Sequence, residues 1–291
     1  MNLILGDKTN ELLNMIYEYL SKSNKGQVIW LDGQDIVNEL KVNDEINADK
    51  TTVKWCYRGM DISPESTTGV LNLLGFLDRS LFNEFTEEDQ EYAQAEFTSY
   101  LLFALNQFKN VLNPSWGATL SGFCQSLPYQ WAFVQQYTQD IQVPRAFFGS
   151  MKHVPNDLIL GYNTIASDNP FNVLYWKIGV PQTLSHDDHY LWYHRPRGNP
   201  FVVTVLDNHM WIQPLHNAIQ YSQALEEVSD LCYALMEHFH LRLGEILFFY
   251  DEKDKLYIFG SIRPNIDVRY IPSSSIPEFL QLISATLSSP P

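Results

Sequence analysis

Apolar residues near the N-terminus form short runs separated by a helical pattern. Residues 2–5, 28–31 and 53–57 are apolar runs of strand length. The segment between the first two runs has apolar residues three and four positions apart, as one face of a helix does: Leu12, Leu13, Ile16, Tyr17 and Leu20. Strands that alternate with a helix are typical of an α/β lobe, so we expect a partly parallel sheet here.

The middle of the chain predicts longer helices. One helix should begin at Thr86, because a hydroxyl followed by acids in the first turn favours a helix N-terminus. A second helix should include residues 131–137. A third should cover residues 222–239, whose apolar side chains fall on one side and therefore predict packing on a core.

Two hairpins are expected in the C-terminal third. Residues 201–206 and 210–212 are apolar runs that flank a tight Asp-Asn turn. Residues 245–250 and 256–262 are longer apolar runs, joined by a charged turn and closed by Pro264. Both segments predict antiparallel strand pairs.

The second hairpin resembles the last two strands of the ATP-grasp fold, whose usual pattern is roughly G-x-I-D-F, a polar turn and then Y-x-F-L-E-I-N-P-N. Upstream segments are similar to the V-x-N-P strand end and the V-P-x-T segment of that family. The matching residues there are Val111, Asn113, Pro114, Val143 and Pro144. Leu127 stands roughly where the family has a lysine. The order and spacing of these short matches carry the resemblance.

This resemblance implies an α/β protein with the order of parts of an ATP-grasp protein. Those parts would be an N-terminal α/β lobe over residues 1–120, a reduced central subdomain over 121–200, and a C-terminal lobe of mixed or antiparallel sheet with helices over 201–291. The chain looks closest to the ATP-grasp ligases that modify ribosomal peptides. In such enzymes ATP phosphorylates a carboxylate, and an amine or hydroxyl then attacks the acyl phosphate.

The family's magnesium ligands are replaced in this chain. Where the resemblance expects two acids and an amide, the sequence has Leu247, Ser261 and Arg263. Magnesium requires oxygen ligands, usually carboxylates together with phosphate oxygens. Leucine offers no ligand, serine offers a neutral oxygen, and arginine brings a permanent positive charge. The substitutions predict that the metal is absent or is held differently.

Other positions are the remaining candidates for contact with a nucleotide. Lys177 ends a strand similar to the one that delivers a lysine to the phosphates, although a solvated lysine is an equally good reading. Arg195 or Arg197 could hold phosphate through a bidentate fork, or could simply be loop residues. Glu245 and Asn265 could supply displaced metal ligands. The segment after Lys177 is too short to cover a triphosphate as the family's glycine-rich flap does.

Composition narrows the class of partner. The chain has 291 residues with 34 acidic and 19 basic side chains, a net charge of -15, and 14% aromatic residues. That charge disfavours attachment to nucleic acid or to an anionic membrane. The N-terminus has neither a secretion signal nor a membrane span, so a cytoplasmic location is expected.

Cysteine and histidine residues give weak signals. Cys56, Cys124 and Cys232 lie among apolar neighbours and are expected to be buried, reduced thiols. His186 and His189 flank two aspartates and could hold a metal ion on a turn. The segment has no evident third ligand, and a polar loop is the better explanation of it.

Two hypotheses for function remain. The first is a degenerate, non-catalytic relative of the ATP-grasp ligases that needs no cofactor and binds a peptide or a partner ligase, as one half of a homodimer or heterodimer. The abundant Trp and Tyr residues suit such an interface. The alternative is an active ATP-dependent carboxylate-amine or carboxylate-hydroxyl ligase that acts on a peptide or amino acid with ATP and magnesium.

Overall fold

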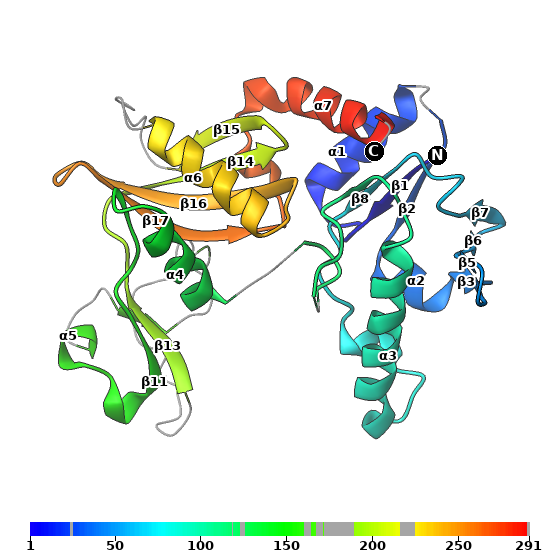
Figure 1. Ribbon diagram of the computed structural model, residues 1–291, viewed down its shortest axis with the longest axis horizontal. Coiled ribbons are helices and arrows are strands. Elements are labelled where there is room, and N and C mark those ends of the chain that lie inside the picture. Colours follow the sequence, from blue (N-terminus) through cyan, green and yellow to red (C-terminus); the bar gives the residue numbers. More distant parts are fainter. Residues whose placement is uncertain are drawn as a thin grey trace. The chain divides into compact units, whose positions relative to one another are not determined.

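The chain divides into two compact units in a computed structural model (Figure 1). The structure describes residues 1–23, 26–117, 119–122, 126–159, 164–166, 171, 189–215 and 225–289. Unit 1 comprises Met1–Cys124, Met236–Gly244 and Pro264–Pro291, and unit 2 comprises Gln125–Leu235 and Glu245–Arg263. The three-part division expected from the sequence stays a prediction.

Unit 1 is built on a four-stranded sheet in the order β2-β1-β8-β9, with every neighbouring pair parallel. Its strands are β2 (Val28–Leu31), β1 (Asn2–Leu5), β8 (Gly69–Asn72) and β9 (Val111–Leu112). The central strands β1 and β8 are buried along their whole length, which explains why Leu3, Ile4 and Leu5 of β1 are consecutive apolar residues. The expected parallel sheet is confirmed.

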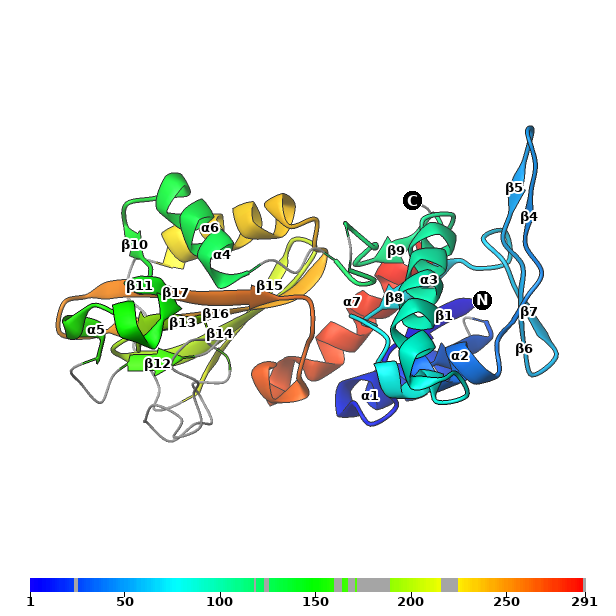
Figure 2. The same ribbon diagram turned by 90° about the horizontal axis from the view of Figure 1, so that it is seen from below.

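Helices cover both faces of this sheet. The helices α1 (Glu11–Lys22) and α7 (Ile276–Ser288) pack against each other on one side, while α2 (Gly33–Asn38) and α3 (Glu87–Leu105) lie on the other (Figures 1 and 2). Asn10 caps α1 by accepting a hydrogen bond from the backbone of Leu13. The helix α3 begins after Thr86, as the sequence predicts.

The apolar run at 53–57 is a strand, but it belongs to a separate small sheet. That sheet has the order β3-β6-β7 and is antiparallel. Its strands are β3 (Lys41–Val42), β6 (Trp55–Tyr57) and β7 (Met60–Ile62); β4 (Glu45–Ile46) and β5 (Thr51–Thr52) form a further hairpin. Trp55 and Tyr57 are buried while Cys56 is only half-buried, the alternation of a strand with one covered face.

Unit 2 contains a five-stranded sheet in the order β10-β17-β16-β14-β15. Its strands are β10 (Ile141–Gln142), β17 (Leu256–Arg263), β16 (Leu243–Asp251), β14 (Asn199–Leu206) and β15 (His209–Pro214). The antiparallel pairs β14–β15 and β16–β17 confirm both predicted hairpins. The helices α4 (Leu127–Tyr137) and α6 (Leu225–His238) lie on one face of this sheet (Figure 2).

A smaller antiparallel sheet completes unit 2, in the order β11-β13-β12. It contains β11 (Ala146–Ser150), β13 (His189–His194) and β12 (Thr164–Ala166), and α5 (Asn156–Ile159) follows β11. Trp192, Val154 and Leu158 form its core. The described residues also contain short 3-10 helices, namely η1 (Arg79–Phe82), η2 (Met151–His153), η4 (Val268–Tyr270) and η5 (Ser273–Ser275). No helix in the described part of the chain is long and apolar enough to cross a membrane.

Candidate functional site

The hairpin β16–β17 brings four residues of interest to one face of the unit 2 sheet. Glu245 pairs with Arg263, and Leu247 pairs with Ser261. Directly opposed residues of an antiparallel pair lie on the same face, and side chains two positions apart on a strand share that face. The ladder is irregular between Leu247 and Phe248, where a β-bulge occurs.

A buried ion pair occupies one end of this face. The Nε and Nη2 atoms of Arg263 donate hydrogen bonds of 2.9 and 2.6 Å to Oε2 of Glu245. The side chain of Glu245 is 0% exposed and that of Arg263 is 24% exposed. The guanidinium also lies 4.0 Å from the ring centroid of Phe171, within the range of a cation–π contact. The positive charge of Arg263 is therefore balanced by a specific carboxylate.

The other pair on this face is apolar and neutral. Leu247 and Ser261 are both buried. The hydroxyl of Ser261 has no hydrogen-bond partner among the described residues. Leu247 packs so close to Gly260 that a Cβ at position 260 would lie 3.0 Å from the Leu247 Cγ and carbonyl oxygen. The absence of a side chain at Gly260 thus makes room for leucine at 247.

These residues do not form a set of magnesium ligands. The four positions provide one carboxylate, Glu245, and the guanidinium of Arg263 already holds it. Leu247 has no ligand atom, and the Ser261 hydroxyl is a weak neutral donor. Asn265, a candidate displaced ligand, is exposed and follows the end of β17. The chemistry of this donor set does not fit a divalent cation held on phosphates.

Side chains of α4 hold the backbone of β17 from the side. β10 pairs only with Tyr257 and Ile258 of β17. Farther along β17, the Gln130 side chain accepts a hydrogen bond of 2.9 Å from the Ile262 N–H and donates one of 3.3 Å to the Ile262 carbonyl. Trp131 Nε1 donates to the Gly260 carbonyl at 2.8 Å. The backbone that positions Ser261 and Arg263 is thus fixed by α4, which no sequence motif indicated.

The two candidate arginines line a separate cavity. This cavity has a volume of about 260 Å³. It is lined by Gln142, Val143, Pro144, Arg145, His194, Arg195, Pro196, Arg197, Asp251, Asp254, Leu256 and Ile258. The structure therefore brings Arg195 and Arg197 together with a third arginine, Arg145. Arg195 is half-buried and Arg197 is exposed.

This cavity lies at the turn end of the β16–β17 hairpin, whereas Glu245 and Arg263 lie at the open end. Asp251 and Glu245 are six residues apart on β16, which corresponds to about 20 Å along a strand. The candidates at the two ends are consequently not brought to a single small site. Lys177 and His186 lie outside the described residues.

The described residues give no support to a metal site at His186 and His189. His189 is exposed at the start of β13. In the described ranges, no group of three or more His, Cys, Asp or Glu residues is arranged to hold a metal ion.

Cys232 is a free thiol that is fully buried, and burial raises its pKa, which disfavours the reactive thiolate. The expectation of a buried thiol is confirmed for Cys232 and is wrong for Cys56, which is only half-buried because it points to the less covered face of β6, while Cys124 lies outside the described residues.

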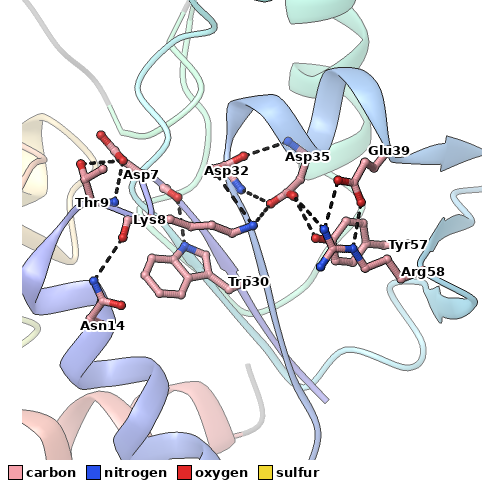
Figure 3. Close-up of polar contacts among 11 residues, drawn as sticks. Asp7, Lys8, Thr9, Asn14, Trp30, Asp32, Asp35, Glu39, Tyr57 and Arg58 are labelled. Carbon is pink, nitrogen blue, oxygen red and sulfur yellow. Dashed lines mark hydrogen bonds and ion pairs between the residues drawn. The ribbon is translucent and has the colours of Figure 1, made fainter.

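A polar network in unit 1 lies where parallel strands end (Figure 3). Lys8 follows β1, while Asp32 and Asp35 follow β2 and form a capping box at the start of α2. Lys8 Nζ contacts the carboxylate of Asp35, and the hydroxyl of Tyr57 donates to the same carboxylate at 2.9 Å. Arg58 pairs with a neighbouring acid, Glu39, at 2.8 Å.

The network fixes the charge state of its central acid. Burial alone would raise the pKa of Asp35, but the hydrogen bonds from Lys8, from the Asp32 backbone and from Tyr57 outweigh it, so the pKa lies below its usual value. The carboxyl ends of parallel strands are a common place for ligands. Here the charges of Lys8 and Asp35 satisfy each other, which is typical of a structural ion pair. The sequence analysis did not identify this network. The signal that could have indicated it is the Asp-x-x-Asp spacing at the α2 N-terminus.

Comparison with known proteins identifies the fold. No protein-family model matches the sequence, and no curated protein matches it either. The macrocyclase MdnC from Microcystis aeruginosa MRC, bound with precursor peptide MdnA, is similar in structure with a TM-score of 0.72 and 14% identity, covering 99% of each chain. The ATP-grasp ligase PsnB, complexed with minimal precursor, Mg and ADP, has a TM-score of 0.69 and 14% identity, covering 98% of this chain and 97% of PsnB.

A third structure is the Chryseobacterium gregarium RiPP-associated ATP-grasp ligase, in complex with ADP and a leader and core peptide. It has a TM-score of 0.60 and 11% identity, covering 99% of this chain and 95% of that chain. All three similarities extend over nearly the whole chain, and the low identities indicate strong divergence. This chain therefore has the α/β ATP-grasp fold, in a form similar to ATP-grasp ligases that have been crystallised with precursor peptides.

Proposed function

We propose that this chain is a non-catalytic protein of the ATP-grasp fold that binds a peptide or a partner ligase in a peptide-modification pathway. The observation that supports it most is the buried Glu245–Arg263 ion pair. Arg263 stands at a position where the resemblance to the ATP-grasp family expects a metal ligand, and its side chain is positively charged. The guanidinium engages the carboxylate and the pair has no net negative charge to attract a cation, so the pair disfavours metal-bound nucleotide.

The peptide part of the proposal is supported by the similar structures. MdnC, PsnB and the Chryseobacterium gregarium ligase were each crystallised with a peptide. Loss of metal ligands leaves the rest of an ATP-grasp surface available for such a partner. A fold that keeps its scaffold without its metal site suits a binding or scaffolding role.

Isothermal titration calorimetry with ATP tests the non-catalytic part. The purified chain is titrated with ATP in the presence of magnesium and again in the presence of a chelator. We expect the two titrations to be the same, because Glu245 is held by Arg263 and the other three positions of this set, Leu247, Ser261 and Arg263, offer no carboxylate. Magnesium-dependent binding in the micromolar range would overturn this part of the proposal.

A restored variant locates the defect. Leu247→Asp, Ser261→Glu and Arg263→Asn together would return two carboxylates and an amide to the hairpin face. The matched control carries Leu247→Asn, Ser261→Gln and Arg263→Asn, which have similar shapes without the charges. Magnesium-dependent ATP binding by the first variant and not by the control would assign the defect to the metal ligands. If neither variant binds, the defect extends beyond this face.

An active ligase is the second candidate, favoured by the cluster of Arg145, Arg195 and Arg197 around one cavity. Arginine forks are suited to phosphate or carboxylate groups. In that case Lys177, Arg195 or Arg197 would contact phosphate, and magnesium would need ligands near that cavity, because Glu245 and Asn265 lie at the other end of the hairpin. An assay for peptide-dependent release of ADP separates the candidates. Release that Arg195→Ala and Arg197→Ala abolish would favour the ligase.

A further inference from the structure

A hollow of about 710 Å³ lies on the surface of unit 1, along the N-terminal half of α3. We call it the α3 groove. Its lining comes from α2, from the segment around η1 and from one face of α3: Val37, Phe82, Phe85, Asp89, Tyr92, Ala93, Glu96, Phe97 and Tyr100. The α3 residues of this set recur three or four positions apart, so they form a single stripe along the helix.

The floor of the α3 groove is aromatic and firmly held. Phe97 lies 6.1 Å from Phe82 and 5.8 Å from Tyr100, measured between ring centroids. The hydroxyl of Tyr100 accepts a hydrogen bond of 2.6 Å from Trp55 Nε1 and donates one of 2.8 Å to Asp44. A floor whose rings are fixed in this way loses little conformational entropy when a partner binds.

The rim of the α3 groove presents apolar surface to solvent. Phe85 is 52% exposed and Tyr92 is 69% exposed. Aromatic side chains in contact with water at the edge of an apolar hollow are typical of a protein-binding site, because their burial provides much of the affinity of such sites. These two rings are the expected anchors.

The charge that α3 brings to the α3 groove is negative, and the one basic side chain beside it on η1, Arg79, donates a hydrogen bond of 2.6 Å to the Glu87 carbonyl. Asp89 and Glu96 line the groove. Residues 83–108 contain six acids and no lysine or arginine. The acids are exposed, and they are Glu84, Glu87, Glu88, Asp89, Glu91 and Glu96. An apolar floor with an anionic rim is complementary to a partner that has apolar side chains flanked by lysine or arginine.

We propose that the α3 groove is a docking site for a basic amphipathic helix of a partner polypeptide. The α3 stripe runs from Asp89 to Tyr100, eleven positions apart and so about 16 Å along the helix, and with Phe85 beyond its end it is long enough to seat a helix of about four turns. A second copy of this chain is disfavoured, since each copy has a net charge of -15. This inference rests on the proposed function, because it states which kind of partner the chain would bind. It does not depend on whether nucleotide binds.

Fluorescence anisotropy with a designed probe tests the inference on the full chain. The probe is a labelled helix of about four turns with leucines at helical spacing and lysines on both flanks. A second probe has glutamates in place of the lysines. We expect saturable binding of the lysine probe that weakens at high salt, and no binding of the glutamate probe, because the rim is acidic.

Variants of the groove assign the site. Tyr92→Ala removes an exposed anchor and should weaken binding of the lysine probe about tenfold. Asp89→Lys with Glu96→Lys should abolish it and allow the glutamate probe to bind. The control is Asp61→Lys with Glu237→Lys, which changes the net charge equally at exposed positions outside the groove lining. That control should bind the lysine probe nearly as wild type does.

Several results would overturn the inference. They are equal binding of both probes, loss of binding in the control double variant, and unchanged binding in Tyr92→Ala together with Asp89→Lys/Glu96→Lys. Self-association that the groove variants abolish, seen by analytical ultracentrifugation, would identify a second copy as the occupant instead. Thermal unfolding of each variant checks that it is folded. None of these results bears on ATP binding, so the inference and the proposed function can fail separately.

Discussion

Arg263 and Glu245 lie directly opposite each other on β17 and β16, and two nitrogens of the guanidinium donate to one carboxylate oxygen that is closed off from solvent. The pair lies on the hairpin face where the sequence resemblance to the ATP-grasp family expects metal ligands. Under the proposed function, this positively charged side chain replaces a ligand of a divalent ion. The ion pair is internal to the chain and requires no ligand.

Removing Arg263 should destabilise the protein strongly. In Arg263→Ala the carboxylate of Glu245 stays buried without its cation, and we expect a loss of about 3 kcal/mol in the free energy of unfolding. Urea unfolding followed by circular dichroism measures it. The double variant Glu245→Leu/Arg263→Met should recover most of the loss, because it leaves no unpaired charge. Equal stability of wild type and Arg263→Ala would show that the pair contributes nothing.

Asn113 should be nearly irreplaceable in unit 1. Its side chain accepts hydrogen bonds from the backbone of Arg242 and Leu243 and donates to the carbonyls of Leu243 and Pro264. Its backbone φ of +60° lies in the left-handed region, which side chains other than Asn and Asp rarely adopt. We expect Asn113→Ala to cost about 3 kcal/mol of unfolding free energy, because buried backbone groups lose their partners.

Two further substitutions at position 113 separate these causes. Asn113→Gly removes the hydrogen bonds but relieves the backbone strain, so it should be more stable than the alanine variant by about 1 kcal/mol. Asn113→Asp keeps the two accepted hydrogen bonds and loses the two donated ones. Equal stability of the Ala and Gly variants would show that backbone conformation is unimportant here.

The ion pair between Lys8 and Asp35 should make unfolding depend on pH. The pKa of Asp35 is lowered below 3.8 in the folded state, so its contribution to stability is present above that pH and is lost as the pH falls further. Hydrogen bonding and charge from Asp35 raise the pKa of Lys8 above 10.5, against the lowering effect of its own burial. The contribution of Lys8 is therefore present below pH 10.5 and is lost as the pH rises through the folded-state pKa.

Thermal unfolding as a function of pH tests this dependence. Asp35→Asn should lower the melting temperature at neutral pH and should flatten its fall in acid. Asp49→Asn removes an equal charge from an exposed turn and serves as the control. An acid-induced fall that is as steep in Asp35→Asn as in Asp49→Asn would exclude a role for this pair.

A glycine contact should limit the packing of α7 on the unit 1 sheet. A Cβ at Gly69 in β8 would lie 2.7 Å from the Leu287 Cα, which is backbone and cannot move aside as a side chain can. We expect Gly69→Ala to reduce the free energy of unfolding by about 2 kcal/mol. A Cβ at Gly75 would meet no atom within 4 Å, so Gly75→Ala should leave stability unchanged or slightly raised. Similar melting temperatures for the two variants would contradict the contact.

Local patterns were sufficient for much of the fold. The β16–β17 hairpin follows from two apolar runs and a charged turn, and the start of α3 follows from the Thr86 cap signal. The prediction of a strand within residues 53–57 is confirmed. Nothing in that segment showed that it pairs in a small sheet apart from the parallel strands. Strand pairing depends on which segments meet in space, and apolar spacing along one segment does not carry that information.

The sequence by itself determined that this chain has leucine, serine and arginine at the positions where the resemblance expects metal ligands, because residue identity and strand alternation are local properties. Only the tertiary structure decided that Arg263 is neutralised by Glu245, that Gln130 and Trp131 hold the β17 backbone, and that α2, η1 and α3 enclose an apolar groove with an acidic rim. Each of these arrangements joins residues far apart or on different elements, and their contacts are fixed by strand register and helix packing. Those in turn depend on how the whole chain buries its apolar surface.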